Sequence, residues 1–352
     1  MEPVKLPAEK HKLLKRGGVW VPSPLALSRD KKVMDKWQRL LTLYYIKSGA
    51  RTVIPGAHTG EFAGGDLDLY AGWLKLVREM VEEHGKGEMF LMAAVGAGHA
   101  RRQAELAARE GFDIVMVAPT AFTNLDDDGA AALMRDIASI IPVFGFELQK
   151  VIPGSRPYTL DLWLRIFEFA CGAKGASFNT YRSQLMLEAA ARSPRRKDLV
   201  LATGNDDRIV NDFASVFPFK VGSRTVKVTY CAGLLGHFAT DTHAAVRWSE
   251  RVRAARDGAR WSLPVPRTEL SHLVNMCNGA LFDAVNDFKN SVWGVKLRLT
   301  QLGLLPEPVC FYEDGRAGMA AEIARAYSAH PMLNDKAFVS ENLASWKREA
   351  GL

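Results

Sequence analysis

The chain has 352 residues, of which 48% are hydrophobic and 24% are charged. This composition excludes an intrinsically disordered chain and provides enough apolar material for the core of a large domain. No apolar run approaches the roughly 18 to 20 residues of a membrane helix, and residues 1–16 are charged and lack the apolar segment of a secretory signal. We therefore expect a cytoplasmic, globular protein with no membrane partner.

The formal net charge is +7 at pH 7, and the excess basic residues are spread through predicted helical segments such as residues 192–197 and 247–260. No aromatic-interleaved basic motif accompanies them, so we expect a solvated basic surface and no nucleic-acid partner. The cysteines are widely scattered and form no CxxC pair: Cys171, Cys231, Cys277 and Cys310. This spacing predicts reduced thiols, with neither a metal site nor a disulfide framework.

Between residues 18 and 255, short β-rich runs alternate with amphipathic helical stretches. The predicted strands cover residues 19–26, 52–55, 89–95, 114–118, 141–146, 172–177, 199–202 and 226–231. The predicted helices cover residues 31–48, 67–84, 100–110, 129–139, 159–170, 181–191, 206–216 and 242–255. Such alternation is typical of parallel strands joined by crossover helices. Eight units over roughly 240 residues predict a (β/α)8 TIM barrel.

After a Pro-rich stretch at residues 260–266, the pattern becomes purely helical. The predicted helices there cover residues 269–286, 288–302, 315–330 and 334–349. We therefore predict three regions, which are a loosely held N-terminal extension (1–17), the barrel (18–260) and a C-terminal helical appendage (261–352).

Lys174 lies in the predicted sixth strand, close to the end that should open at the C-terminal mouth of the barrel. TIM barrels place their chemistry at this mouth. Removal from water lowers the pKa of a lysine and makes its neutral amine available as a Schiff-base nucleophile. A solvated charge is the alternative interpretation of a single lysine.

The loop after the second predicted strand reads Gly56-Ala57-His58-Thr59-Gly60. Two glycines allow a tight turn that points N–H groups at an anion, and Thr59 adds a hydroxyl, so the loop is a candidate cradle for a substrate carboxylate. A tight βα turn before a capped helix is the structural alternative.

Three further segments lie in the same order as motifs of a known family: residues 95–98, residues 118–122 and Gly172-Ala173-Lys174. Together with the loop at residues 57–61, they resemble the dihydrodipicolinate synthase and N-acetylneuraminate lyase family of Schiff-base class I aldolases. The resemblance covers about residues 20–330, and residues 203–207 and 231–237 are similar to a divergent branch of unknown function. It implies a TIM barrel, a covalent imine on Lys174 without a cofactor, a small 2-oxo acid substrate such as pyruvate, and a homodimer or homotetramer.

One position departs from the family pattern. The fifth strand of the family ends in Tyr-Asn and its tyrosine relays protons, whereas this chain has Phe146-Glu147. A phenyl ring cannot transfer a proton, which argues against authentic dihydrodipicolinate synthase activity. His58 is the leading substitute because histidine titrates near pH 7, and Glu147 is a second one if a twist turns it toward the mouth.

Four other residues are candidate substrate contacts. Phe146 would lie beside the lysine, and Asn205 and Asp206 end the predicted seventh strand, where they would hold substrate hydroxyls or cap the next helix. His237 follows the last predicted strand, and its side chain is interpreted either as a substrate contact or as part of the core.

Three functions remain open. The first is a lyase or aldolase that cleaves or forms a C–C bond of a small 2-oxo acid. The second keeps the imine but dehydrates or hydrates a sugar acid or an aromatic 2-oxo compound, which apolar residues near the mouth would suit: Phe122, Phe146, Phe178 and Phe238. The third is a binding or regulatory barrel without catalysis, because fold alone does not decide function.

Overall fold

Eight parallel strands form a nearly closed barrel in the computed structural model, which describes residues 2–96 and 98–352. Neighbouring strands follow the order β2-β1-β10-β7-β6-β5-β4-β3, and the two ends of this order meet where Ala94 N donates to Pro55 O over 2.9 Å. The barrel strands are β1 (Gly18–Pro22), β2 (Thr52–Ile54), β3 (Met92–Val95), β4 (Ile114–Val117), β5 (Val143–Leu148), β6 (Gly172–Ala176), β7 (Val200–Thr203) and β10 (Ala232–Leu234). The predicted TIM barrel is thus confirmed.

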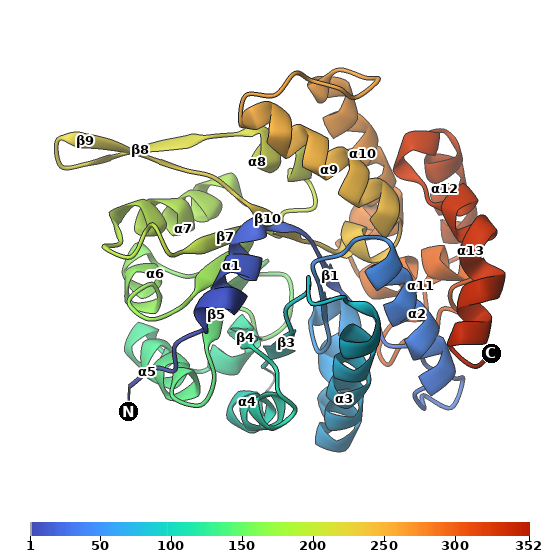
Figure 1. The fold of residues 1–352 in the computed structure, drawn as a ribbon, viewed down its shortest axis with the longest axis horizontal. Coiled ribbons are helices and arrows are strands. Elements are labelled where there is room, and N and C mark those ends of the chain that lie inside the picture. The colour runs from blue at the N-terminus through green and yellow to red at the C-terminus, as the bar shows by residue number, and fades with distance from the viewer. Residues whose placement is uncertain (1, 97) are drawn as a thin grey trace.

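Helices surround this barrel and continue past it (Figure 1). The outer helices are α2 (Asp35–Lys47), α3 (Leu67–His84), α4 (Ala100–Arg109), α5 (Asp127–Ala138), α6 (Leu160–Ile166), α7 (Thr180–Arg192), α8 (Ile209–Ala214) and α9 (Thr242–Arg256). Short 3-10 helices are η1 (His58–Gly65), η2 (Pro119–Phe122), η3 (Gly236–Ala239), η4 (Ala284–Asn286) and η5 (Pro331–Leu333). Within the described residues, no helix has both the length and the apolar character needed to cross a membrane.

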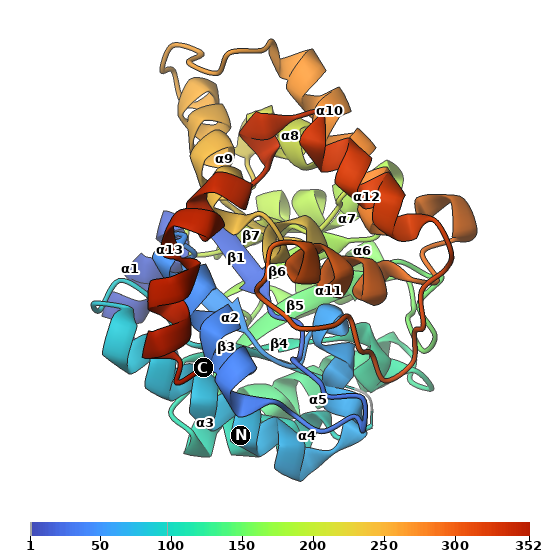
Figure 2. The same cartoon turned by 90° about the vertical axis from the view of Figure 1, so that its right-hand side faces the viewer.

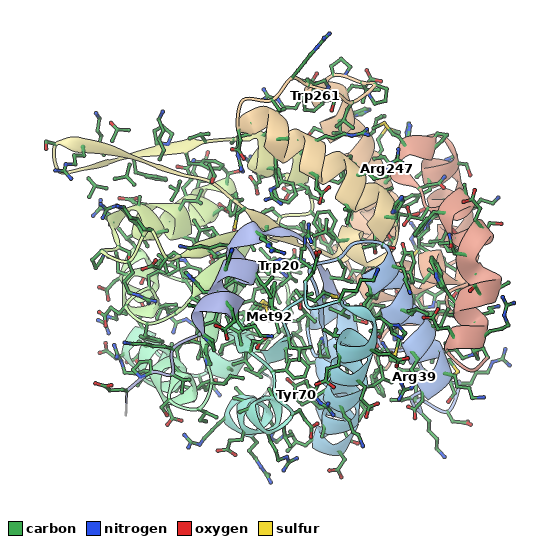
Figure 3. All side chains as sticks on the ribbon, in the orientation of Figure 1. Trp20, Arg39, Tyr70, Met92, Arg247 and Trp261 are labelled. Carbon is green, nitrogen blue, oxygen red and sulfur yellow. The ribbon has the colours of Figure 1, made fainter. Side chains whose placement is uncertain are left out.

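The barrel interior is filled by alternate residues of the strands, because successive side chains of a strand point to opposite faces. On β5, Phe144, Phe146 and Leu148 belong to the inner apolar cluster. Trp20 of β1 contacts Phe144, with ring centroids 5.6 Å apart. Trp20 and Met92 lie at the centre of the molecule in Figure 3 and belong to this same inner cluster.

The N-terminal segment, predicted as a loosely held extension, contains a packed helix. Residues Ala8–Arg16 form helix α1, and Leu14 is completely buried within the inner cluster of the barrel. Lys10 pairs with Asp113 at 3.1 Å, so the helix is held by apolar and ionic contacts. Scattered charges had hidden the short apolar side of this helix.

The predicted eighth strand at residues 226–231 was wrong. Residues Phe217–Val221 (β8) and Arg224–Val228 (β9) form an antiparallel hairpin that projects from the barrel (Figure 1). The eighth barrel strand is the shorter β10, and Cys231 immediately precedes it. An alternating apolar pattern indicates a strand but does not specify the sheet that it joins.

The C-terminal helices are α10 (Arg267–Leu281), α11 (Ser291–Gln301), α12 (Met319–Ser328) and α13 (Lys336–Glu349). Figure 2 shows α11 in front of β5 and β6, across the mouth of the barrel. Arg298 of α11 donates two hydrogen bonds to Asp241, at 2.9 and 2.7 Å, and this buried pair ties the helix to the barrel. The boundary at residue 260 stays a prediction.

Candidate active site

Lys174 points into the barrel from β6, near the C-terminal ends of the strands. It is registered opposite Phe146 on β5 and Ala202 on β7, and its side chain is only 7% exposed. Its Nζ atom lies 4.2 Å from the centre of the Phe146 ring. The inward neighbours Ala176 and Ala202 are small and leave room for the lysine between larger apolar side chains.

A cavity of about 60 Å³ opens above this lysine. A single water needs roughly 10–15 Å³ by the same measure, so the cavity has room for a few waters or one small organic acid. Its wall combines barrel loops with the C-terminal region: Pro22, Ala57, His58, Thr59, Leu148, Gln149, Lys174, Ala176, Phe178, Gly204, Asp206, Gly236, Phe282, Phe288, Ser291, Val292 and Val295.

Burial governs the ionisation of Lys174. Removal from water lowers its pKa well below the ordinary lysine value, and the nearby Asp206 carboxylate opposes this shift. In the part of the chain that the structure describes, its ammonium group has no ion-pair partner within 4.0 Å. The site therefore favours a neutral, nucleophilic amine at a pH where an exposed lysine is charged.

Asp206 lines the same cavity from the loop that follows β7. Its Oδ1 accepts a hydrogen bond from the backbone N–H of His237 over 3.1 Å, and its backbone carbonyl accepts one from Asn278 over 2.6 Å. Burial raises the pKa of Asp206 above the usual range of an aspartate. These contacts place an ionisable carboxyl group on the wall that faces Lys174.

The loop at residues 56–60 contributes part of the predicted cradle. Ala57, His58 and Thr59 line the cavity, and η1 begins at His58, so the first amides of this helix have no carbonyl partner within it. Burial and the nearby Lys174 lower the pKa of His58 to about 4. His58 is therefore neutral near pH 7.

The two glycines of the loop have a packing role instead of a place on the cavity wall. Gly56 has a φ of 78°, and a Cβ atom there would lie 2.6 Å from Ala94 O. A Cβ atom on Gly60 would lie 2.5 Å from the ring of Trp73. Both glycines allow the close approach of neighbouring elements that fixes the loop.

A buried ion pair holds this loop to the C-terminal helices. Glu61 accepts a hydrogen bond from Lys296 of α11 over 2.8 Å, and both side chains are almost completely buried. The second oxygen of Glu61 accepts bonds from the backbone N–H groups of Phe311 and Tyr312, at 2.6 and 3.2 Å. The position of His58 and Thr59 thus depends on residues far away in the sequence.

Two predicted site residues lie away from the cavity. Glu147 follows the strand alternation outward, where Arg182 Nε donates to it over 2.8 Å and Tyr158 N over 3.2 Å. Asn205 turns toward the outer helices, where it accepts from Phe178 N over 3.0 Å and donates to Ser183 over 3.1 Å. Both side chains are fully buried in these polar contacts, which indicates a structural role.

His237 and Phe146 also lie behind the wall of the cavity. The ring of His237 packs beside Trp248, and its Nδ1 lies 2.7 Å from Asn278 Oδ1. Its side chain therefore orders the loop, and only its backbone N–H reaches Asp206. Phe146 contacts the lysine itself from within the inner cluster.

No family model matches the chain, and no curated protein matches its sequence. Solved structures match it over most of its length. Dihydrodipicolinate synthase from Oceanobacillus iheyensis is 15% identical, with a TM-score of 0.71 that covers 91% of this chain and 98% of that chain. N-acetylneuraminate lyase from Mycoplasma synoviae is 14% identical, with a TM-score of 0.67 over 89% and 98%. The chain shares the fold of these two enzymes.

A third match is dihydrodipicolinate synthase from Acinetobacter baumannii, solved in complex with pyruvate. It is 16% identical, with a TM-score of 0.68 over 90% of this chain and 99% of that chain. At such low identity, the likeness to dihydrodipicolinate synthase establishes the fold alone. The chemistry has to be argued from the side chains around Lys174.

The side of the cavity opposite the barrel was missed from the sequence. It consists of a set of C-terminal residues: Phe282, Phe288, Ser291, Val292 and Val295. Gln149, which follows β5, was also missed. Of the apolar residues predicted near the mouth, Phe178 lines the cavity and contacts Phe288, with ring centroids 5.5 Å apart. Phe122 and Phe238 pack among other aromatic side chains, beside Tyr158 and Trp248. Ala97, in the predicted loop at residues 95–98, lies outside the described residues.

Proposed function

We propose that this protein is a Schiff-base lyase or aldolase that acts on a small 2-oxo acid through Lys174. The observation that carries the proposal is a buried lysine, without an ion-pair partner among the described residues, at the C-terminal mouth of a barrel and on the wall of a small cavity. Few positions hold a lysine in this way, because burying an unpaired amine is costly unless the neutral form is used. TIM barrels carry their catalytic residues at this end.

The cavity supports a substrate of about the size of pyruvate. Its volume of about 60 Å³ suits a small organic acid. A carboxylate bound near Thr59 would meet the hydroxyl of this residue and the amides at the start of η1. The pyruvate complex of the A. baumannii synthase, which has the same fold, supports the same substrate class.

In the proposed reaction, the neutral amine of Lys174 attacks the ketone carbon of the 2-oxo acid. A C–N bond forms, the carbonyl oxygen leaves as water with the two protons of the amine, and the imine nitrogen takes up one proton from solvent to give a protonated imine. The imine then accepts the electron pair of a breaking C–C or C–H bond. This chemistry needs no cofactor, because the electron sink is made from the substrate and the lysine.

Borohydride trapping tests this proposal. The protein is incubated with pyruvate, 2-oxobutyrate, an aromatic 2-oxo acid and a sugar-derived 2-oxo acid, and then reduced and weighed intact. We expect an adduct with at least one of them. Failure with the whole panel would contradict the proposed function and favour a binding or regulatory barrel.

The apolar cap supports a second candidate, which keeps the imine but dehydrates or hydrates a compound with an apolar or aromatic group. Phe178, Phe282 and Phe288 contribute aromatic side chains to the cavity wall. Once an adduct is found, release of pyruvate and loss of water from the matching substrates are measured in parallel. Pyruvate release supports the lyase, and water loss without pyruvate supports the dehydratase.

A further inference from the structure

The imine chemistry needs a group that moves protons, and the position of the family tyrosine holds Phe146. In the described part of the chain, three ionisable side chains line the cavity: His58, Lys174 and Asp206. Lys174 is the proposed nucleophile, which leaves His58 and Asp206. Glu147 is excluded, because its contacts with Arg182 and Tyr158 hold it outside the cavity.

We propose that the Asp206 carboxyl group is the proton carrier of this site, taking a proton from the carbon next to the imine and returning it later. This inference rests on the proposed function of Lys174. The resemblance implies a tyrosine at the end of β5 as the proton carrier, and this inference assigns that role to a carboxyl group in the loop after β7.

The path of the lysine brings its amine toward the loop that contains Asp206. β6 and β7 are hydrogen-bonded neighbours, and this pairing continues where Gly204 N donates to Gly175 O over 2.7 Å. Lys174 runs directly over Gly204, because its Cε atom would lie 2.3 Å from a Cβ atom at that position. The end of the lysine side chain thus lies against the segment that leads into Asp206.

Hydrogen bonds hold Asp206 in place, but they do not cancel the charge of its carboxylate. The backbone N–H of His237 donates a hydrogen bond to Oδ1 of Asp206. Asn278 donates to the backbone carbonyl of Asp206 and is also hydrogen-bonded to the ring of His237. Among the described residues, no cation lies within 4.0 Å of its carboxylate, unlike Glu61 and Asp241, which pair with Lys296 and Arg298. A carboxylate that is held but not ion-paired retains its capacity to accept a proton.

The electrostatics of the cavity favour Asp206 over His58. Burial raises the pKa of Asp206 toward the range in which it both donates and accepts protons near neutral pH. His58 has its pKa lowered to about 4 and is a poor acceptor by comparison. Two charged neighbours also act on the pKa of Asp206: Lys174 lowers it, and Asp207 raises it further.

In the step assigned to Asp206, a C–H bond of the methyl group next to the protonated imine breaks. The proton passes to the Asp206 carboxylate, the electron pair of the bond forms a C=C bond, and the imine nitrogen becomes a neutral enamine nitrogen. The reverse step returns a proton from the carboxylic acid to that carbon. No oxidant or co-reactant is needed, since one proton and one electron pair account for the change.

The assigned step is measured directly by NMR in D2O, as exchange of the methyl protons of pyruvate or of the methylene protons next to the ketone of 2-oxobutyrate. We expect wild-type protein to catalyse the exchange and Asp206→Asn to slow it by roughly a hundredfold or more, the range of general acid–base catalysis. Borohydride trapping on Lys174 should persist in Asp206→Asn, since the amide still accepts from His237 N–H. Asp30→Asn, which makes the same change at an exposed aspartate outside the cavity wall, is the matched control and should exchange like wild type.

The outcomes separate the two proposals. If wild-type protein forms no trapped adduct, the proposed function fails. If it forms an adduct but Asp206→Asn exchanges within about threefold of wild type, or if wild type forms an adduct and does not exchange protons, the assignment of Asp206 is overturned and Lys174 retains its role. Asp206→Ser, which also accepts from the His237 N–H, replaces Asp206→Asn if the latter does not fold, and the same result is expected.

Discussion

Lys174 and Gly204 are packed so closely that the Cε atom of the lysine lies 2.3 Å from the position of a Cβ atom on residue 204. The Cβ atom of Ala176 lies 2.6 Å from the same Cβ position on residue 204. The lysine can therefore cross from β6 over β7 only because residue 204 has no side chain. This contact fixes where the amine enters the cavity.

Gly204→Ala should displace the lysine without removing it. The added methyl group overpacks the site, and we expect a loss of about 1–3 kcal/mol in the free energy of unfolding. The rate of borohydride trapping should fall at least about tenfold, since a misplaced reacting group is costly. Chemical denaturation and trapping kinetics measure the two effects. Gly72→Ala in α3 is the control, because a Cβ atom there meets open space and the helix should gain about 0.5–1 kcal/mol.

Glu147→Gln should separate a structural role from a catalytic one. The glutamine keeps the size and an oxygen acceptor for Arg182 and Tyr158 N but loses the charge that pairs with Arg182, whose side chain is 18% exposed. We expect a loss of about 1–3 kcal/mol in stability and a trapping rate per folded molecule within about threefold of wild type. A loss of trapping in fully folded protein would restore Glu147 as a catalytic candidate.

Lys296→Met should loosen the loop that holds His58 and Thr59. It leaves Glu61 buried without its ion-pair partner, which costs about 3–5 kcal/mol. The 2-oxo acid concentration needed for half-maximal trapping should rise, because η1 contributes to the cavity wall. Arg29→Ala is the control. It breaks a pair with Glu307 in which the arginine is 86% exposed, so it should leave both stability and half-maximal trapping close to wild type. Equal effects of both changes would contradict this account of the loop.

The pH dependence of trapping follows from the lowered pKa of Lys174. The neutral amine is the reactive form, so the rate should rise with pH and level off well below pH 10.4, the ordinary lysine value. The Asp206 carboxylate raises the pKa of Lys174, so Asp206→Asn should move the midpoint to lower pH. An unchanged or higher midpoint would show that the two groups do not interact.

Much of the fold could be predicted from the sequence, because parallel strands and crossover helices leave strong local periodicities. Helix α3 begins and ends at the predicted residues, and Lys174 lies on a barrel strand as expected. The outward direction of Glu147 also follows from counting along β5 from Phe146. These features depend on local patterns that a short window contains.

The rest depended on contacts between distant segments. The segment that runs between the cavity-lining residues Phe282 and Phe288 contains two aspartates. Asp283, Asp287 and Phe288 have φ values of 53°, 55° and 64°, in a region that non-glycine residues seldom adopt. Nothing in their own sequence indicates this conformation, which is held by surrounding packing. Asp206 was seen only as a helix cap or a hydroxyl ligand, because its nearness to Lys174 appears only when β6 and β7 are paired.

Peptide mapping of the reduced adduct tests the role of Lys174 most directly. Protein incubated with pyruvate or another accepted 2-oxo acid is reduced with borohydride, digested and sequenced by mass spectrometry, beside a Lys174→Met variant whose fold is checked by circular dichroism. We predict one modified lysine, Lys174, and no adduct in the folded variant. Modification of other lysines only, or an equal adduct in Lys174→Met, would contradict the imine mechanism.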